Sequence, residues 1–214
     1  DGLMTVPDAV RFALPEQKEG VWRISFLSPT PEGAEYLGRN HRFVAALARY
    51  LMEESLTQHS QARASRCGVI RSRAVNQLTT LYLLRARYLV EQPGRAPLFS
   101  EEVRVLTYTS SPTGEPTWME DDQARRLLVD ARPDANVPMP EKRALITAAL
   151  EEWPAMEERL KAHIETRARD LEGAHRRIRQ AVHLRVRELS IRPQFPVDLL
   201  GLLVIAPVME AVKR

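Results

Sequence analysis

Residues 141–184 have the sequence EKRALITAALEEWPAMEERLKAHIETRARDLEGAHRRIRQAVHL, the longest regular segment of the chain. Its apolar residues recur every three or four positions: Leu145, Ala149, Trp153, Met156, Leu160, Ile164, Ala168, Leu171, Ala174, Ile178 and Val182. This spacing is typical of a helix that buries one stripe. Pro154 lacks a backbone donor and costs a helix interior about 3 kcal/mol, so we expect the helical arm to be kinked or broken near Pro154.

The buried stripe needs a surface to pack on, and the remaining sequence supplies segments typical of strands. They cover residues 21–27, 64–75, 78–90 and 102–108, with one or two more in the closing segment 188–207. Shorter helices are predicted near residues 40–55 and 121–129. We therefore predict an α+β fold, in which a mostly meandering antiparallel sheet of about 5–6 strands is packed by the long C-terminal helical arm 141–184 and by shorter helices.

Length and composition favour one globular domain. The 214 residues are 44% hydrophobic and 28% charged, as in ordinary globular proteins. We expect residues 1–20 to be an irregular lead-in from an upstream domain, because the chain opens on Asp1 and not on methionine. Residues 21–207 then form a single α+β domain, and residues 208–214 a C-terminal tail.

Cysteine content and hydropathy bear on the compartment. Cys67 is the only cysteine, so no intrachain disulfide can form, which favours the reducing cytoplasm. The best apolar run, residues 197–208, is shorter than the roughly 20 residues that a membrane helix needs. We therefore expect a cytoplasmic protein without a membrane partner.

Catalytic and metal-binding motifs are missing from the sequence. No glycine precedes a lysine, so the phosphate loop G-x-x-x-x-G-K-[ST] is absent. The histidines lack the spacing of metal ligands, and Glu120-Asp121-Asp122 fits the first turn of a helix better than a Mg²⁺ site. Cys67 with His59 has no third, orienting residue, so a small core residue is the better interpretation of Cys67. We predict no catalytic, cofactor-binding or metal-binding residues in this chain.

Basic residues give the remaining signal. Between Arg159 and Arg192 ten Arg or Lys residues face four acids, a local charge of +6. Guanidinium groups bind phosphates bidentately, so nucleic-acid contact is one interpretation. The candidate residues are Arg63, Arg66, Arg71, Arg73, Arg176, Arg177 and Arg179. The alternative is a solvated face whose arginines pair with Glu165, Asp170 and Glu172 along the helix.

Five blocks of the sequence point to a family: residues 41–51, 65–75, 79–88, 174–179 and 193–202, the last reading PQFPVDLLGL. They resemble blocks in the C-terminal region of large bacterial Swi/Snf-like ATP-dependent helicases of the DEAD/DEAH type (superfamily two), over residues 21–207. The resemblance implies a parent enzyme with two RecA-like motor lobes that use ATP and Mg²⁺. Those lobes act on duplex nucleic acid or strip proteins from it. This chain would be its C-terminal accessory domain, and no catalytic residue carries over.

Two hypotheses follow. In the first, the chain is a non-catalytic domain that positions nucleic acid, or the upstream motor lobes, in an ATP-dependent helicase or translocase. In the alternative, it is a protein-interaction module that docks the parent enzyme on a partner such as RNA polymerase or a defence-system subunit. An unpaired apolar stripe on the helical arm would favour the alternative.

Overall fold

A computed structural model describes residues 5–15, 20–57, 64–110, 116–181 and 189–208. The chain forms two compact units, residues 1–66 and residues 67–214. The sequence prediction placed one domain over residues 21–207, whereas the structure divides this range between Arg66 and Cys67. The two units are described separately.

The N-terminal unit contains a short 3-10 helix Asp8–Ala13, a parallel pair of two-residue strands, β1 Ile24–Ser25 and β2 Glu35–Tyr36, and helix α1 Arg42–Leu56. A small apolar cluster holds it together, with Val10, Ala13, Leu37 and Phe43 buried. His41 caps α1, because its Nδ1 accepts a hydrogen bond from the Phe43 amide.

The second unit is built on a five-stranded sheet with strand order β3-β7-β4-β5-β6. The strands are β3 Cys67–Ser72, β4 Thr79–Glu91, β5 Leu98–Ser110, β6 Pro116–Trp118 and β7 Ser190–Pro207. The predicted α+β class, with a mostly antiparallel sheet and a long C-terminal helix, is confirmed.

The meander itself is limited to β4, β5 and β6, because β7 enters between β3 and β4. β7 runs parallel to β3 and antiparallel to β4. Neighbouring residues Val204 and Ile205 point to opposite faces of the sheet and are both buried. A strand that is apolar on both faces is best accommodated in the interior of a sheet, which explains this position.

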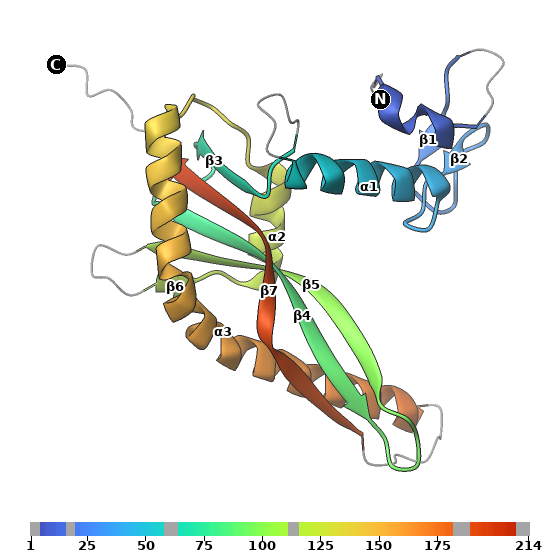
Figure 1. The fold of residues 1–214 in the computed structure, drawn as a ribbon. Coiled ribbons are helices and arrows are strands. Elements are labelled where there is room, and N and C mark those ends of the chain that lie inside the picture. Colours follow the sequence, from blue (N-terminus) through green and yellow to red (C-terminus); the bar gives the residue numbers. More distant parts are fainter. Residues whose placement is uncertain (1–4, 16–19, 58–63, 111–115, 182–188, 209–214) are drawn as a thin grey trace. The chain divides into compact units, whose positions relative to one another are not determined.

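The long helix α3 runs without interruption from Met139 to Ala181, with Pro154 inside it. It changes direction in its middle, between its yellow and orange parts (Figure 1). The helix is therefore kinked and not broken. Proline lacks the N–H that would bond the carbonyl of Leu150 one turn earlier, and this is a common cause of helix bending.

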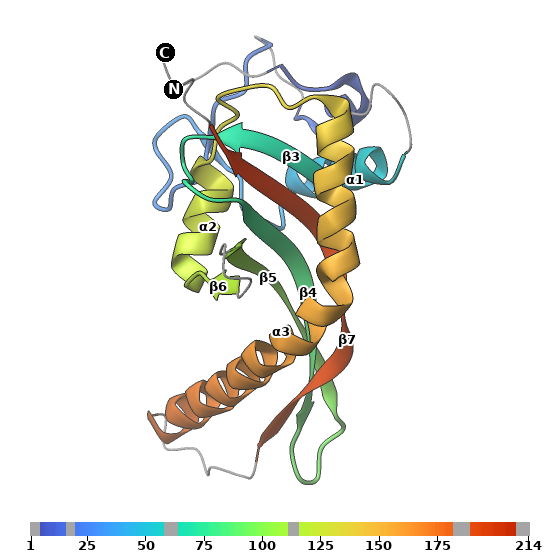
Figure 2. The same cartoon turned by 90° about the vertical axis from the view of Figure 1, so that its left-hand side faces the viewer.

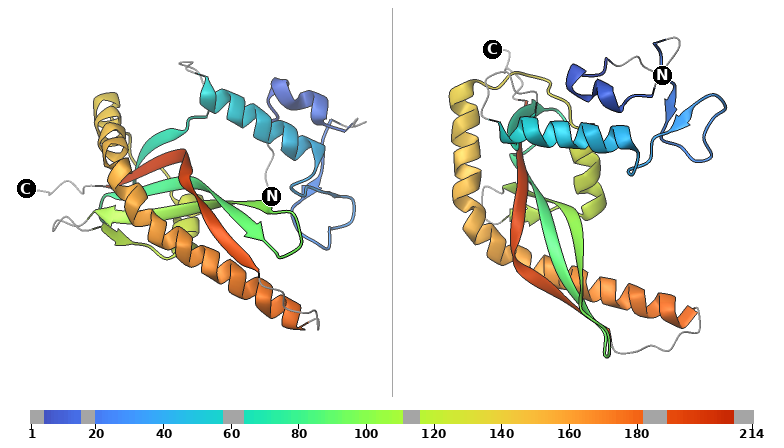
Figure 3. Two further views of the ribbon diagram at one scale, coloured as in Figure 1. Left: turned by 60° about the horizontal axis from the view of Figure 1, so that its bottom comes forward. Right: turned by 45° about the vertical axis from the view of Figure 1, so that its right-hand side comes forward.

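α3 covers one face of the sheet with the predicted apolar stripe. Met156 and Leu160 pack against Tyr82, Leu84 and other residues of one core cluster. Further along, Ile164 and Ala168 pack in a second cluster. The shorter helix α2, Asp121–Asp130, contacts β5, and Figures 2 and 3 show it apart from α3 in the same unit.

Candidate functional site

The predicted arginines lie in separate places. Arg71 and Arg73 are at the end of β3, near the beginning of α3, whereas Arg176, Arg177 and Arg179 belong to the last turns of α3. From Glu141, the partner of Arg71, to Arg176 the helix axis extends about 50 Å at 1.5 Å per residue. The predicted arginines of β3 and α3 therefore do not form one surface. The remaining two are Arg63, which lies outside the described residues, and Arg66, the last residue of the N-terminal unit.

Arg71 is part of the framework that holds the start of α3. Its Nη2 lies 2.5 Å from Oε1 of Glu141, and both side chains are largely covered. The Arg71 carbonyl accepts a hydrogen bond from the Asp134 amide at 2.8 Å, and Arg71 forms an isolated bridge with Ala135. These contacts fix the chain that leads from α2 into α3, so Arg71 has little freedom to bind a phosphate.

Arg73 differs from Arg71, because its backbone and not its side chain is fixed. The Arg73 amide donates to Oδ2 of Asp134 at 2.7 Å, and the Ser72 hydroxyl donates to the same oxygen at 3.3 Å. The guanidinium lies 3.9 Å from the other carboxylate oxygen, and the side chain is 76% exposed. The guanidinium of Arg73 thus keeps most of its donors for other partners.

The last turns of α3 carry the other three predicted arginines, Arg176, Arg177 and Arg179. Arg176 pairs with Glu172 one turn earlier, Nη2 to Oε1 at 3.0 Å. Arg177 is exposed and Arg179 is half-buried, and neither forms an ion pair within the described part of the chain. The predicted pairing of this face with acids therefore holds for Arg176 alone. Positive charge in the last turn also suits the negative end of the helix dipole.

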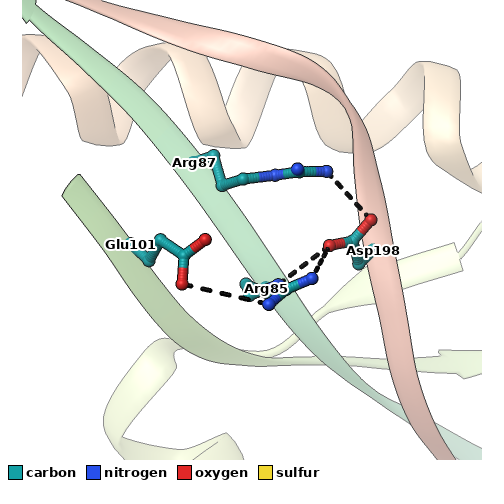
Figure 4. A network of polar contacts seen from close by, with 4 residues as sticks. All are labelled: Arg85, Arg87, Glu101 and Asp198. Carbon is teal, nitrogen blue, oxygen red and sulfur yellow. Dashed lines mark hydrogen bonds and ion pairs between the residues drawn. The ribbon is translucent and has the colours of Figure 1, made fainter. Parts of the chain in front are cut away.

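A polar network that sequence reasoning missed joins β4, β5 and β7 (Figure 4). Arg85 donates to Oδ2 of Asp198 through Nε at 2.8 Å and Nη2 at 2.6 Å. Arg87 donates to Oδ1 of the same carboxylate at 3.0 Å. Oε2 of Glu101 lies 3.9 Å from Nη1 of Arg85. Hydrogen bonds from Arg85, followed by the charges of both arginines, hold the pKa of the Asp198 carboxyl below its usual value.

This network lies on the sheet face away from α3, because Arg85 and Arg87 alternate with the buried Ala86 and Tyr88. The pairing of β4 with β7 shifts register next to it, between Arg85 and Arg87. Two arginines and two acids balance in charge. The network therefore fastens β7 to β4 at an irregular step, and offers no surplus positive charge to a ligand.

A second polar cluster lies beside the middle of α3. Arg104 is buried and forms an ion pair with Asp121 in the first turn of α2. Asp121 therefore joins α2 to β5 in addition to its place at the start of the helix. Arg167 of α3 binds Glu102 through two nitrogens, at 3.1 and 2.9 Å. Burial, followed by the charge of Glu102, raises the pKa of Tyr88 to about 12. This tyrosine therefore stays protonated at neutral pH.

One open cavity of about 610 Å³ belongs to neither network. It lies among the link from β3 to β4, the ends of β4 and β5, and α2, and Arg73 is the only predicted residue in its lining. On these strands Thr79 and Thr109 have the opposite parity to Tyr82 and Tyr108, which face α3. The cavity therefore opens on the face away from α3.

Metal-binding groups and membrane helices are not found among the described residues. Across the ranges that the structure covers, no three His, Cys, Asp or Glu residues are arranged to hold a metal ion. None of the helices described above is both long and apolar enough to cross a bilayer. Cys67 is half-buried in β3, and His59, considered with it, lies outside the described residues.

Comparison with known proteins yields one match. The model of a family described as "Domain of unknown function (DUF8741)" matches residues 53–212. That range includes every described strand and helix of the second unit. No curated protein and no solved structure matches the chain.

Proposed function

We propose that this chain, which belongs to the family described as domain of unknown function DUF8741, is a non-catalytic domain of an ATP-dependent helicase or translocase. In this role it helps to position nucleic acid, or the motor lobes, of the parent enzyme. The ATP and Mg²⁺ that drive the motor are bound by the motor lobes. The domain works in the cytoplasm, where its single cysteine stays reduced.

The nucleic-acid role rests on the arginines at the end of α3. Arg177 is exposed without an ion pair in the described part of the chain, next to Arg176 and Arg179. Exposed guanidiniums on one helix end can each contact a phosphate of a nucleic-acid backbone. Such contacts are insensitive to sequence, which suits a domain that positions a strand for a motor and does not select a site.

The test reverses this charge. The full chain carrying Arg176→Glu, Arg177→Glu and Arg179→Glu is titrated with fluorescent duplex DNA at several salt concentrations. We expect weaker binding and a flatter dependence of log K on log salt, by up to about 0.9 for each lost phosphate contact.

A matched control reverses three other arginines, Arg49, Arg125 and Arg143. They are exposed and form no ion pair within the described ranges. The control has the same net charge as the test variant, so a general loss of attraction affects both. If the two variants bind alike, or if the test variant keeps the wild-type affinity and slope, the nucleic-acid role of α3 is wrong.

The alternative, a protein-interaction module, is favoured by a different surface. The stripe on α3 is buried or half-buried through Ala174, and Ile178 is its one mostly exposed member among the described residues, so α3 supplies little of the apolar surface that this hypothesis needs. Leu98, Phe99 and Val103 of β5, however, are 66%, 73% and 54% exposed. β6 pairs β5 only at Tyr108–Ser110, so the outer edge of β5 is otherwise unpaired among the described strands. Exposed apolar side chains on a free strand edge favour a protein partner.

This alternative predicts that Phe99→Asp abolishes recovery of a partner by the full chain used as bait, whereas Leu128→Asp, an exposed apolar residue on α2, does not. Recovery of the same partner by both variants would contradict it. RNA polymerase, a defence-system subunit and the parent's own motor lobes are the partners to assay.

A further inference from the structure

We propose that the cavity beside α2 is a nucleotide-binding site. It takes a nucleotide that is either free in solution or at an unpaired position of a nucleic-acid strand. Binding of a nucleotide within a strand rests on the proposed function, whereas binding of a free nucleotide does not. The size is suitable, because the cavity holds about 610 Å³ and pockets for small ligands span roughly 300–1,000 Å³.

Part of the cavity lining is apolar. Val75, Met119, Leu127 and Ala131 contribute to its lining, and each of them is half-buried, so they still offer apolar surface to a ligand. A flat apolar body can cover these side chains and gain the free energy of removing them from water. Methionine sulfur also makes favourable contacts with aromatic rings, which suits a nucleobase.

The lining carries positive charge from two different segments of the chain. Arg73 comes from the turn after β3, and Arg126 comes from α2. Arg126 is exposed and forms no ion pair with any described residue, although Asp122 and Asp130 lie one turn away on the same helix. Arg73 reaches only the outer limit of an ion pair with Asp134, at 3.9 Å.

The lining includes one acid, Asp130, so its formal charge is +1. Two guanidiniums that retain unused donors indicate an anionic group with several oxygens, such as a phosphate.

Two amide side chains complete the lining. Asn76 and Gln123 are exposed residues of the lining, and neither forms a side-chain hydrogen bond within the part of the chain that is described. An amide presents both a donor and an acceptor, which matches the mixed pattern on the edge of a nucleobase. A lining that combines apolar, amide and cationic side chains fits a base linked to a phosphate better than it fits either part alone.

The experiment measures binding of AMP, adenosine, inorganic phosphate and octadeoxyadenylate to the full chain, by calorimetry and by amide shifts in NMR spectra. We expect AMP to bind more tightly than adenosine or phosphate. Arg126→Ala should weaken AMP binding about ten-fold, because it removes a charge-assisted contact. Arg125→Ala, the exposed neighbour outside the lining, should leave binding unchanged.

A second variant fills the cavity. Ala131→Phe places a ring in the space that the ligand needs, and unchanged circular dichroism would show that the fold is kept. Loss of AMP binding in this variant supports the site. If octadeoxyadenylate binds but AMP does not, and Arg126→Ala weakens it, the strand is the source of the nucleotide.

The proposal is overturned if neither AMP nor the oligonucleotide binds at millimolar concentration, or if Arg125→Ala and Arg126→Ala lower the affinity equally. Its failure is separable from that of the proposed function. The Arg176→Glu, Arg177→Glu, Arg179→Glu variant leaves the cavity lining unchanged, so it should bind AMP like the wild type.

Discussion

The two ends of α3 differ in what surrounds their charges and their apolar side chains. In the first third of the helix, Glu141 accepts from Arg71 at 2.5 Å and Glu152 accepts from the Tyr108 hydroxyl at 2.7 Å. In the last turns Arg177 is exposed, and Ile178, although it continues the apolar stripe, is 63% exposed. One end is therefore held by the sheet, and the other presents its side chains to solvent.

This difference separates residues that hold the fold from residues that can contact a partner. Both ends carry charged side chains, so the presence of charge alone does not distinguish them. What distinguishes them is whether each charge already has a partner within the unit. Substitutions near the first end should therefore change stability, and substitutions near the last end should change binding.

The largest expected effect comes from the buried stripe. Leu160 is 1% exposed and packs in the core cluster of α3 with the sheet. Leu160→Ala removes this packing and leaves a cavity, and we expect the free energy of unfolding to fall by about 2–5 kcal/mol. Urea unfolding followed by circular dichroism measures this change.

The matched control is Ile178→Ala, in the same helix and on the same stripe. Because Ile178 is mostly exposed, we expect its replacement to change the free energy of unfolding by less than about 0.5 kcal/mol. Equal losses in the two variants would show that the end of α3 is covered after all, and the comparison between the two ends would be wrong.

Much of this fold could be predicted from local patterns. The spacing of Ala149, Met156, Leu160 and Ile164 predicts the buried face of α3, and Pro154 predicts its kink. The place of β7 could not be predicted in this way, because β7 pairs with strands about a hundred residues or more earlier, as Tyr82 with Leu202. The available signal was Val204-Ile205, apolar on both faces, which indicates an interior strand.

The candidate sites were less predictable, for the same reason. The pair of Arg176 with Glu172 follows from helical spacing and was anticipated. The pairs of Arg71 with Glu141 and of Arg85 with Asp198 join residues far apart in sequence, so no local pattern shows that these arginines are engaged. The cavity beside α2 is likewise formed by segments that only the folded sheet brings together.

Substitution of Arg71, near the first end of α3, should have a smaller effect on stability. Arg71→Ala leaves Glu141 half-buried without its partner, and we expect a loss of about 1 kcal/mol in the free energy of unfolding, since both groups retain some solvent. The same variant should bind duplex DNA like the wild type.

Arg177→Ala should do the reverse, with unchanged stability and weaker DNA binding. Paired denaturation and DNA titration of the two variants measure both quantities. If Arg71→Ala lowered the affinity for DNA without lowering stability, Arg71 would be a nucleic-acid-binding residue and not part of the framework.

The smallest effect concerns pH and the network of Figure 4. The pKa of Asp198 is lowered in the folded state by Arg85 and Arg87. A carboxyl whose folded pKa lies below its unfolded value of about 3.9 stabilises the fold above that pH, and the contribution is lost as pH falls through the folded pKa. Asp198→Asn removes it.

The difference in stability between wild type and Asp198→Asn should therefore be constant from pH 7 to about pH 5 and should shrink below about pH 4. Urea unfolding at a series of pH values measures it. Asp170→Asn, an exposed acid on α3 without an ion pair among the described residues, serves as the control for a change of net charge. Because Asp198 is shared by two arginines of β4, a difference that persisted unchanged to pH 2 would mean that its carboxylate charge does not fasten β7. The irregular step in the pairing would then be held by backbone and apolar contacts alone.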